Sequence, residues 1–227
     1  MLQETDSAAA EQAVPGDIVD AVFAIVCRCL PVDHAYALQQ AIQEALPWFA
    51  QEPHAGLHTV HGAASASGWM RPEGADALLQ LSHRAKLVLR LPRHRLDDAA
   101  ALLGRTLHVA GRPLRVDRIT LRPLSRITTL FSRCVVLAAE GDEPAFVAAA
   151  AGELDALGIQ PGEMLCGRMT SIATPGCTLQ TRSLMLAGLT VEQSLLLQKT
   201  GLGAERKLGC GLFIPHKAIG DLRARLD

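Results

Sequence analysis

The sequence predicts an α+β fold in which one order of elements, β-α-β-β-α-β, occurs twice along 227 residues. Apolar runs of strand length alternate with Ala-rich segments of helical period, and Gly or Pro separates most of them. The length allows two domains of about 100 residues each. With 49% hydrophobic and 20% charged residues, the composition is that of a globular chain, which excludes wholesale disorder.

Six segments of the first half fit this order. We expect a strand at 17–29, a helix at 31–47, a short strand at 57–62, an alternating strand at 77–91, a short helix at 95–103 and a hairpin or one bulged strand at 106–121. Asp33 is the expected N-cap of the first helix, and Gly104 is expected to end the second.

The second half repeats the order. We expect a strand at 127–139, a helix at 144–157, strands at 164–173 and 178–189, a helix at 191–200 and a last strand at 212–214. Thr190 is the expected cap of the last helix, with Glu192 or Gln193 completing a capping box. The repeat predicts tandem ferredoxin-like (RRM-like) domains: a disordered tail 1–16, an N-terminal domain 17–124 and a C-terminal domain 125–227.

Hydropathy and cysteine spacing limit the class of protein further. No run of about 18 uncharged apolar residues is present, so we expect no spanning helix. The N-terminal segment is acidic where a secretory signal would be basic, so we expect a cytoplasmic protein. The six cysteines form no CxxC pair, which favours reduced thiols over a structural zinc. Three of them lie in or directly beside expected strands and are interpreted as packed rather than reactive: Cys134, Cys166 and Cys177.

Charge is distributed very unevenly along the chain. Residues 1–83 hold ten acids and two bases, a net of −8, and residues 134–227 have a net of −2. Residues 84–133 hold twelve Lys or Arg against three acids, a net of +9. A basic segment of this density is typical of a surface that binds a polyanion. Composition alone leaves open the alternative that these arginines are solvated strand faces.

A glycine-rich element, GLGAERKLGCGLFIPHK, occupies residues 201–217. Its glycines allow positive φ and close approach of backbone N–H groups to phosphate oxygens, while Arg206 and Lys207 supply compensating charge. It is neither a triphosphate P-loop, because GxxxxGK[ST] is missing, nor a dinucleotide fingerprint, because it follows a helix. The alternative interpretation is a long C-terminal helix cap.

Four histidines, His34, His54, His58 and His61, lie within 28 residues on or just after the first expected helix. Histidine is the usual side chain for proton transfer near neutral pH. His58 and His61 have the spacing of a metal pair, but no nearby Cys or acid completes a site, so we expect no metal. For each histidine taken singly, a surface or capping role is the alternative.

The glycine-rich pattern G-x-G-x-x-[KR]-x-x-G-x-G, here 201–211, at the end of a tandem ferredoxin-like chain resembles the RAMP superfamily of CRISPR-associated proteins. Segments 31–38, 56–58 and 87–92 most resemble the sixth Cas family, the endoribonucleases that cut CRISPR repeat RNA. The likeness spans about residues 17–217. A generic RRM-like binder is disfavoured, because Tyr36 is the single tyrosine and base stacking needs exposed aromatics.

The resemblance implies cleavage without metal or cofactor. The 2′-OH of the RNA would attack the adjacent phosphate and leave a 2′,3′-cyclic phosphate and a 5′-OH, and the enzyme would stay bound to its product. In this family a catalytic histidine lies on the first helix or in the loop after it. We expect His34 in the first helical turn, where the positive helix end favours phosphate, with His58 second and Tyr36 third; His54 is a further loop candidate.

The resemblance also implies partners: CRISPR repeat RNA, with other Cas proteins of an effector complex beside it. The residues expected to contact RNA are Arg84, Arg90, Arg112, Arg115, Gly201, Gly203, Arg206, Lys207, Gly209 and Gly211. The alternative function is a non-catalytic RAMP subunit that holds guide RNA within such a complex.

Overall fold

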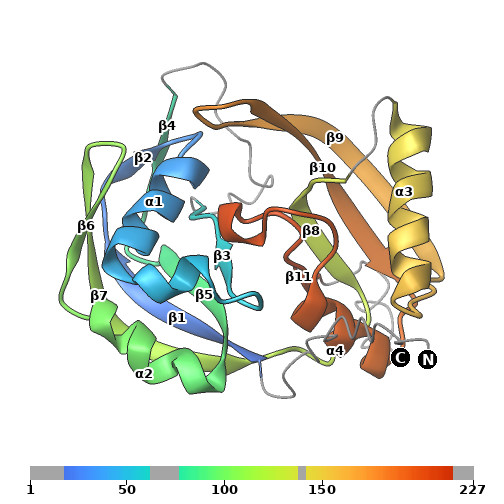
Figure 1. Cartoon of the computed structure of the whole chain (residues 1–227), viewed down its shortest axis with the longest axis horizontal. Coiled ribbons are helices and arrows are strands. Elements are labelled where there is room, and N and C mark those ends of the chain that lie inside the picture. The colour runs from blue at the N-terminus through green and yellow to red at the C-terminus, as the bar shows by residue number, and fades with distance from the viewer. Residues whose placement is uncertain (1–17, 62–76, 138–141, 217–227) are drawn as a thin grey trace, which may run out of the picture.

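The computed structural model describes residues 18–61, 77–137 and 142–216, so the expected tail 1–16 lies outside the described residues. Two antiparallel sheets, each accompanied by helices, lie side by side (Figure 1). Each sheet belongs to one half of the chain, and the functional site described below lies where the two halves meet.

The N-terminal domain contains a five-stranded sheet of order β3-β5-β1-β7-β6 and a separate β2–β4 ribbon. Four of the sheet strands, β3-β5-β1-β7, have the order of a ferredoxin-like unit, with its first and third strands at the centre. The elements are β1 Ile18–Val26, β2 Cys29–Pro31, α1 Ala35–Ala45, η1 Pro47–Ala50, β3 Gly56–His58, β4 Leu78–Gln80, β5 Lys86–Pro92, η2 Arg93–Arg95, α2 Leu96–Ala99, η3 Ala100–Leu102, β6 Thr106–Val109 and β7 Arg112–Pro123.

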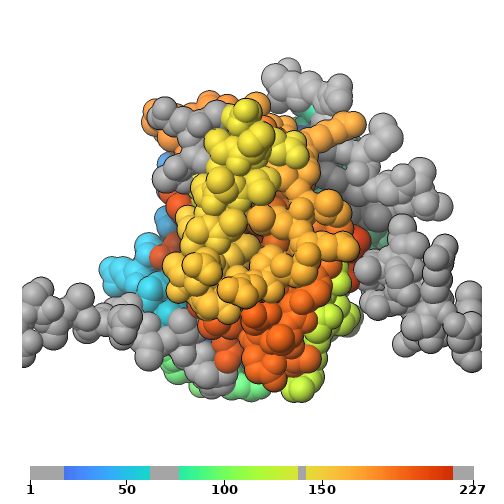
Figure 2. Space-filling view, turned by 90° about the vertical axis from the view of Figure 1, so that its right-hand side faces the viewer, coloured from blue at the N-terminus to red at the C-terminus, as the bar shows by residue number. Residues whose placement is uncertain are grey.

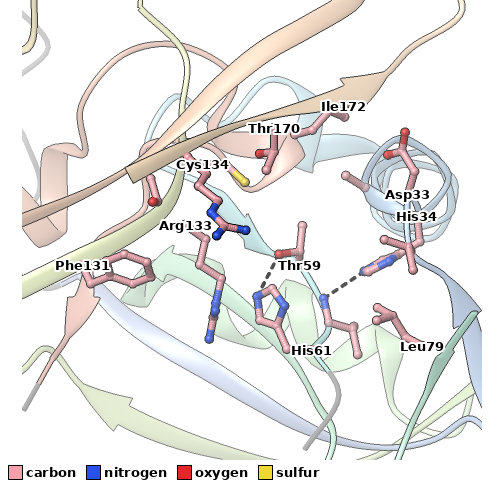
Figure 3. A pocket seen from close by; sticks show the side chains of 15 residues that line it. Asp33, His34, Thr59, His61, Leu79, Phe131, Arg133, Cys134, Thr170 and Ile172 are labelled. Carbon is pink, nitrogen blue, oxygen red and sulfur yellow. Dashed lines mark hydrogen bonds between the residues drawn. The ribbon is translucent and has the colours of Figure 1, made fainter. Parts of the chain in front are cut away.

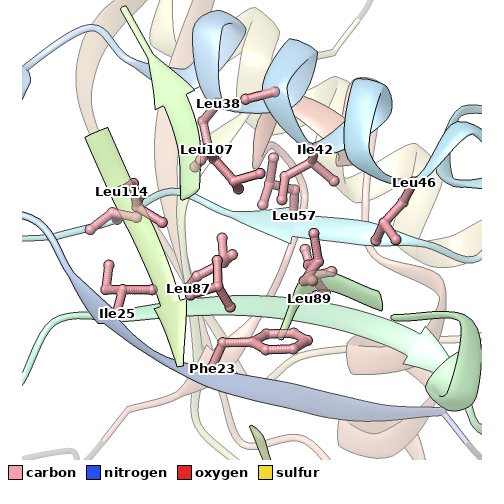
Figure 4. Packing of buried hydrophobic residues seen from close by; sticks show 14 of the residues in the cluster. Phe23, Ile25, Leu38, Ile42, Leu46, Leu57, Leu87, Leu89, Leu107 and Leu114 are labelled. Carbon is pink, nitrogen blue, oxygen red and sulfur yellow. The ribbon is translucent and has the colours of Figure 1, made fainter. Parts of the chain in front are cut away.

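The core of this domain forms between the sheet and α1 (Figure 4). Alternate residues of β1, such as Phe23 and Ile25, point to one face of the sheet, since strand side chains have a period of two. Leu38 and Ile42 lie four apart in α1 and meet that face. Both periods are visible in the sequence, which is why local pattern predicts this packing.

The C-terminal domain has a four-stranded sheet of order β11-β8-β10-β9, again the ferredoxin-like order. Its elements are β8 Leu130–Val135, α3 Glu143–Ala156, β9 Glu163–Ala173, β10 Thr178–Ala187, α4 Val191–Thr200, η4 Arg206–Leu208 and β11 Ile214–Pro215. The expected capping box forms between Thr190 and Gln193, and α3 lies across the outside of the domain (Figure 2). The tandem ferredoxin-like prediction is confirmed.

Three local predictions are wrong. The expected strand 77–91 is two strands, because Leu79 pairs with Leu30 in the ribbon whereas β5 enters the main sheet. The first helix begins at Ala35 with His34 as N-cap, because the Asp33 carboxylate instead accepts a hydrogen bond from Ala173 N–H at 2.8 Å. Cys177 is exposed in the turn between β9 and β10, so it is not a packed strand residue.

A buried ion pair within the N-terminal domain also forms hydrogen bonds to the C-terminal domain. Arg90, 1% exposed, binds the Asp20 carboxylate with both Nε (2.8 Å) and Nη2 (3.2 Å). Its Nη1 donates across the domain boundary to the carbonyls of Gln198 (3.0 Å) and Phe213 (2.8 Å). Burial alone would raise the pKa of Asp20, but the Arg90 charge and the neighbouring His58 hold it well below its usual range.

A small apolar cluster adds a second connection between the domains. Ala35 of α1 packs with Ile172 of β9 and with Leu208 and Cys210 of the glycine-rich element, and Tyr36 packs against the same cluster. The bonds of Arg90 and this cluster both connect the two halves, and residues from both halves line one cleft.

Candidate active site in the interdomain cleft

A pocket of about 340 Å³ lies between the domains (Figure 3). The N-terminal domain contributes the start of α1, the segment after β3 and one residue of β4, and the C-terminal domain contributes three strands. The lining residues are Val32, Asp33, His34, Ala35, Thr59, Val60, His61, Leu79, Phe131, Arg133, Cys134, Arg168, Thr170, Ile172 and Ser183.

A β-bulge shapes the C-terminal wall of this pocket. Ser183 of β10 stands opposite two residues of β8, Arg133 and Cys134, and opposite two residues of β9, Gly167 and Arg168. A bulge alters the alternation of side chains, and bulges occur often beside active sites. Four of these five residues line the pocket, so the irregularity turns two arginines toward the cleft.

His61 lines the cleft together with His34 and these arginines. It follows the short strand β3 by three residues, it is half-buried, and its Nε2 lies 3.1 Å from the Thr59 hydroxyl. In Figure 3 it lies between Arg133 and His34. His61 and Arg133 also line a smaller hollow together with His58 and Gly209. A proton-transfer group and a cation thus share one concave site.

Arg133 approaches the cleft from β8. Burial lowers the pKa of its guanidinium, which remains a cation near neutral pH because an arginine starts above 12. The guanidinium carbon lies 5.9 Å from the ring centre of Phe131, another lining residue. A cation in a partly buried wall interacts more strongly with an incoming phosphate than one in bulk water.

His34 is buried, 3% exposed, and both of its ring nitrogens contact backbone. Nδ1 donates to the Pro31 carbonyl at 2.8 Å, and Nε2 accepts from the Val60 N–H at 3.1 Å. These bonds hold a neutral tautomer and fix the backbone one residue before His61. The geometry therefore favours a positioning role for His34 over the proton transfer expected from the sequence.

The other two candidate catalytic residues lie away from the pocket lining. His58 faces inward, with Nε2 3.8 Å from the Asp20 carboxylate. Burial lowers its pKa, although the attraction of Asp20 opposes this. Tyr36 packs against the interdomain apolar cluster. His54 lies near Arg206, and burial lowers its pKa as well.

The glycine-rich element packs between the domains. A Cβ on Gly203 would lie 2.0 Å from the Val136 carbonyl oxygen, and one on Gly211 would lie 2.1 Å from that of Leu202, so these glycines permit close backbone approach. Gly209 lies against Leu57 and Thr59, and a Cβ on Gly201 would meet the Gly211 carbonyl oxygen. This packing fits the alternative interpretation given above, in which the element is a long cap at the end of the preceding helix.

The two cations of this element bind protein carbonyls. Arg206 donates to the carbonyls of Thr200 and Lys199 at the end of α4, and Lys207 Nζ donates to the Ala50 carbonyl at 2.6 Å. Burial, together with the charge of Arg90, lowers the pKa of Arg206 to about 10. These contacts join α4 to the N-terminal domain, and they use both terminal nitrogens of Arg206 and one of the three donors of Lys207.

The remaining expected RNA-binding residues divide by exposure. Arg84, Arg112 and Arg115 are exposed, and Arg112 and Arg115 line a second pocket beside β2 and β4. Arg90 is buried in the ion pair with Asp20. The expectation that Arg90 contacts RNA is therefore wrong, and the reason is that the C-terminal domain covers its strand there.

Within residues 18–61, 77–137 and 142–216, no group of three or more His, Cys, Asp or Glu is arranged to hold a metal ion. Over the same ranges no helix is long and apolar enough to cross a bilayer.

Sequence reasoning missed the pairing of His61 with Arg133. In the sequence, His61 was considered only as half of a possible metal pair with His58, and Arg133 only as one of the twelve Lys or Arg residues of segment 84–133. The three strands of the C-terminal wall were predicted, but the bulge was not. The available signal was the order of the repeated unit, which places β8 at the centre of its sheet and next to the cleft.

Comparison with known proteins agrees with this description. The family model "Cas6 Crispr" matches residues 19–218. A CRISPR-associated endonuclease Cas6 of Myxococcus xanthus (strain DK1622) is 34% identical over 197 residues, covering 87% of this chain and 81% of that protein. Two solved structures, a Cas6-related protein from Pyrococcus furiosus and "An RAMP protein binding different RNA substrates", each align with a TM-score of 0.62. They cover 86% and 88% of this chain and 97% and 100% of theirs, at 12% and 11% identity, and so support the fold alone.

The tandem fold and the cleft thus define a protein of two ferredoxin-like domains that share an interdomain cleft. The family match and the Myxococcus relative make the assignment specific: the chain belongs to the Cas6 family. The resemblance drawn from the sequence is confirmed.

Proposed function

We propose that this protein is the endoribonuclease that processes CRISPR repeat RNA, and that it cleaves without a metal through attack of a 2′-OH on the adjacent phosphate. Family membership supports the processing role. The single observation that supports the chemistry is that His61 and Arg133, from different domains, line one pocket large enough for a phosphate and its sugars.

His61 is the proton-transfer group in this proposal. The 2′-oxygen forms a bond to phosphorus and loses its proton to a base, the bond from phosphorus to the 5′-oxygen breaks, and that oxygen takes up a proton. Imidazole suits either transfer, because its ordinary pKa lies near neutrality. The products are a 2′,3′-cyclic phosphate and a 5′-OH.

Arg133 and Arg168 would stabilise the additional negative charge on the phosphorane. Cations positioned where charge develops lower the barrier most when the site excludes water. His34 would act indirectly, because its bond to the Val60 N–H orients the segment that carries His61. His58 and Tyr36 have no step in this proposal.

The test compares His61→Ala with wild type on repeat RNA in EDTA, with mapping of both product ends. We expect wild type to yield the cyclic phosphate, and the variant to lose about 10²- to 10⁴-fold in single-turnover rate while keeping its RNA affinity. His108→Ala, at an exposed histidine of β6, is the matched control.

Two results would contradict the proposal. Wild type that requires Mg²⁺ or Mn²⁺ would exclude the metal-free mechanism. Wild type that binds repeat RNA without cutting it under any condition would instead support the alternative, a non-catalytic RAMP subunit.

A further inference from the structure

We infer a second RNA contact, outside the cleft: a groove that binds the phosphate backbone of nucleotides flanking the cleaved bond. This inference rests on the proposed function. The groove has a volume of about 490 Å³, and we call it the arginine groove. Its lining residues are Val26, Cys27, Arg28, Cys29, Gln80, Thr106, Arg112, Pro113 and Arg115.

The charge of the arginine groove is uniform. Arg28, Arg112 and Arg115 line it, and no Asp or Glu does. Arg115 is 64% exposed and pairs with Asp117 at 3.1 Å, outside the lining. Among the described residues, the ion pairs include neither Arg28 nor Arg112. Positive charge without compensation in a concave surface attracts a polyanion.

The three arginines are brought together by the fold. Arg28 lies in the short turn between β1 and β2, whereas Arg112 and Arg115 belong to the first residues of β7. Two pairings fix the groove walls, Cys29 with Gln80 in the ribbon and Thr106 with Arg115 in the hairpin. Figure 1 shows the ribbon and the β6–β7 hairpin near one another at one end of the domain.

The ribbon also relates the groove to the cleft. Leu79 lines the cleft pocket, while its neighbour Gln80 lines the arginine groove. Successive residues of a strand point to opposite faces, so the β2–β4 ribbon is the wall between the two sites. A single RNA strand that passes over this thin wall reaches both of them.

Phosphate recognition fits the chemistry of the groove better than base recognition does. It contains three guanidinium groups and no aromatic residue, so it offers charge and hydrogen-bond donors without a stacking surface. Arg28 and Arg112 are exposed, so replacing them leaves the core intact. The ligand class is therefore the RNA backbone, independent of base sequence.

The test measures binding of a fluorescently labelled repeat RNA with a 2′-deoxy nucleotide at the cut site, over a range of salt concentrations. The variant is Arg28→Gln with Arg112→Gln, and the matched control is Arg93→Gln with Arg126→Gln, which removes two exposed charges elsewhere. For two lost contacts to a single strand, the log–log salt slope becomes shallower by roughly 1.4, and affinity at 0.1 M salt falls about tenfold or more. The control retains the wild-type slope.

A second arm uses RNA shortened to the few nucleotides around the cut. On this short RNA we expect the groove variant to bind as wild type does. On the long RNA with its 2′-OH present at the cut site, we expect an unchanged single-turnover rate at saturating enzyme. An unchanged salt slope on the long RNA, or a binding defect that persists on the short RNA, would show that the arginine groove is not an RNA contact. In either case, cleavage by wild type would still support the proposed function. Wild type that neither binds nor cleaves overturns both.

Discussion

His34 and His61 differ in what their rings contact, although both lie at the cleft. We expect His34→Ala to lower the cleavage rate about 10- to 100-fold and the free energy of unfolding by about 1–3 kcal/mol, because the buried Val60 N–H and Pro31 carbonyl lose their partner. His34→Gln, which offers an acceptor to Val60, restores part of both. Urea unfolding and single-turnover assays measure the two effects. A glutamine variant that is stable yet as inactive as alanine would point to proton transfer instead.

The lowered pKa of His58 leads to a prediction of how the free energy of unfolding depends on pH. Its pKa in the folded protein is lower than the ordinary value of 6.5, because it is buried. The unfolded chain therefore binds the proton more readily, and the stability due to neutral His58 is complete above about pH 6.5 and declines as the pH falls below it. The decline is at most about 1.4 kcal/mol per pH unit for one proton.

Urea unfolding of wild type and His58→Gln between pH 8 and 5 measures this contribution. The variant should show a flatter dependence, with a remainder from His54, whose pKa is lowered in the same direction. Equal slopes for the two proteins would show that His58 does not titrate differently in the folded state. His108→Gln, at an exposed histidine, is the control.

Among the elements, the glycine-rich loop gives a prediction with an internal control. Gly203→Ala places a Cβ 2.0 Å from the Val136 carbonyl oxygen at a φ of +73°, whereas Gly104→Ala has a similar φ of +76° and no atom within 4 Å. We expect about 1 kcal/mol of destabilisation at Gly104 from backbone strain, and roughly 3 kcal/mol or more at Gly203, where the clash adds to it. Chemical denaturation measures both, and similar losses would refute close packing of the loop.

An element could be predicted from the sequence where neighbouring residues determine it, and could not where residues far away in the chain do. The helix 191–200 and its capping box follow from neighbouring residues, so sequence alone was sufficient. The split of 77–91 into β4 and β5 depends on Leu30, far away in the chain, and no local period shows it. His61 lies in an irregular segment, where periodicity carries no information. Arg90 and Arg115 are alike in sequence, and tertiary contacts alone bury one and expose the other.

At the scale of the whole molecule, the Asp20–Arg90 pair contributes to the contact between the two domains. Arg90→Gln leaves the Asp20 carboxylate with less compensation and removes two interdomain bonds, so we expect a loss of about 3–5 kcal/mol. Asp20→Asn with Arg90→Gln should lose less than the sum of the single variants, as a double-mutant cycle by urea unfolding would show. Additive losses would show that the two residues act independently. Because Arg122 also binds Asp20 at 2.9 Å, part of the compensation remains in the single variant.

In chain order the glycine-rich loop follows β8, β9 and β10, and this order affects when the cleft is completed during synthesis. The first domain contains every strand of its own sheet by Pro123, and domains generally fold as they emerge from the ribosome. The cleft, however, still lacks its second wall, and Gly209 has not yet packed against Leu57 and Thr59 beside His61. The nascent chain therefore exposes a basic surface before it has a complete pocket. If the cleft is the site of cutting, as proposed above, the chain cannot cut RNA before β8, β9 and β10 complete that wall.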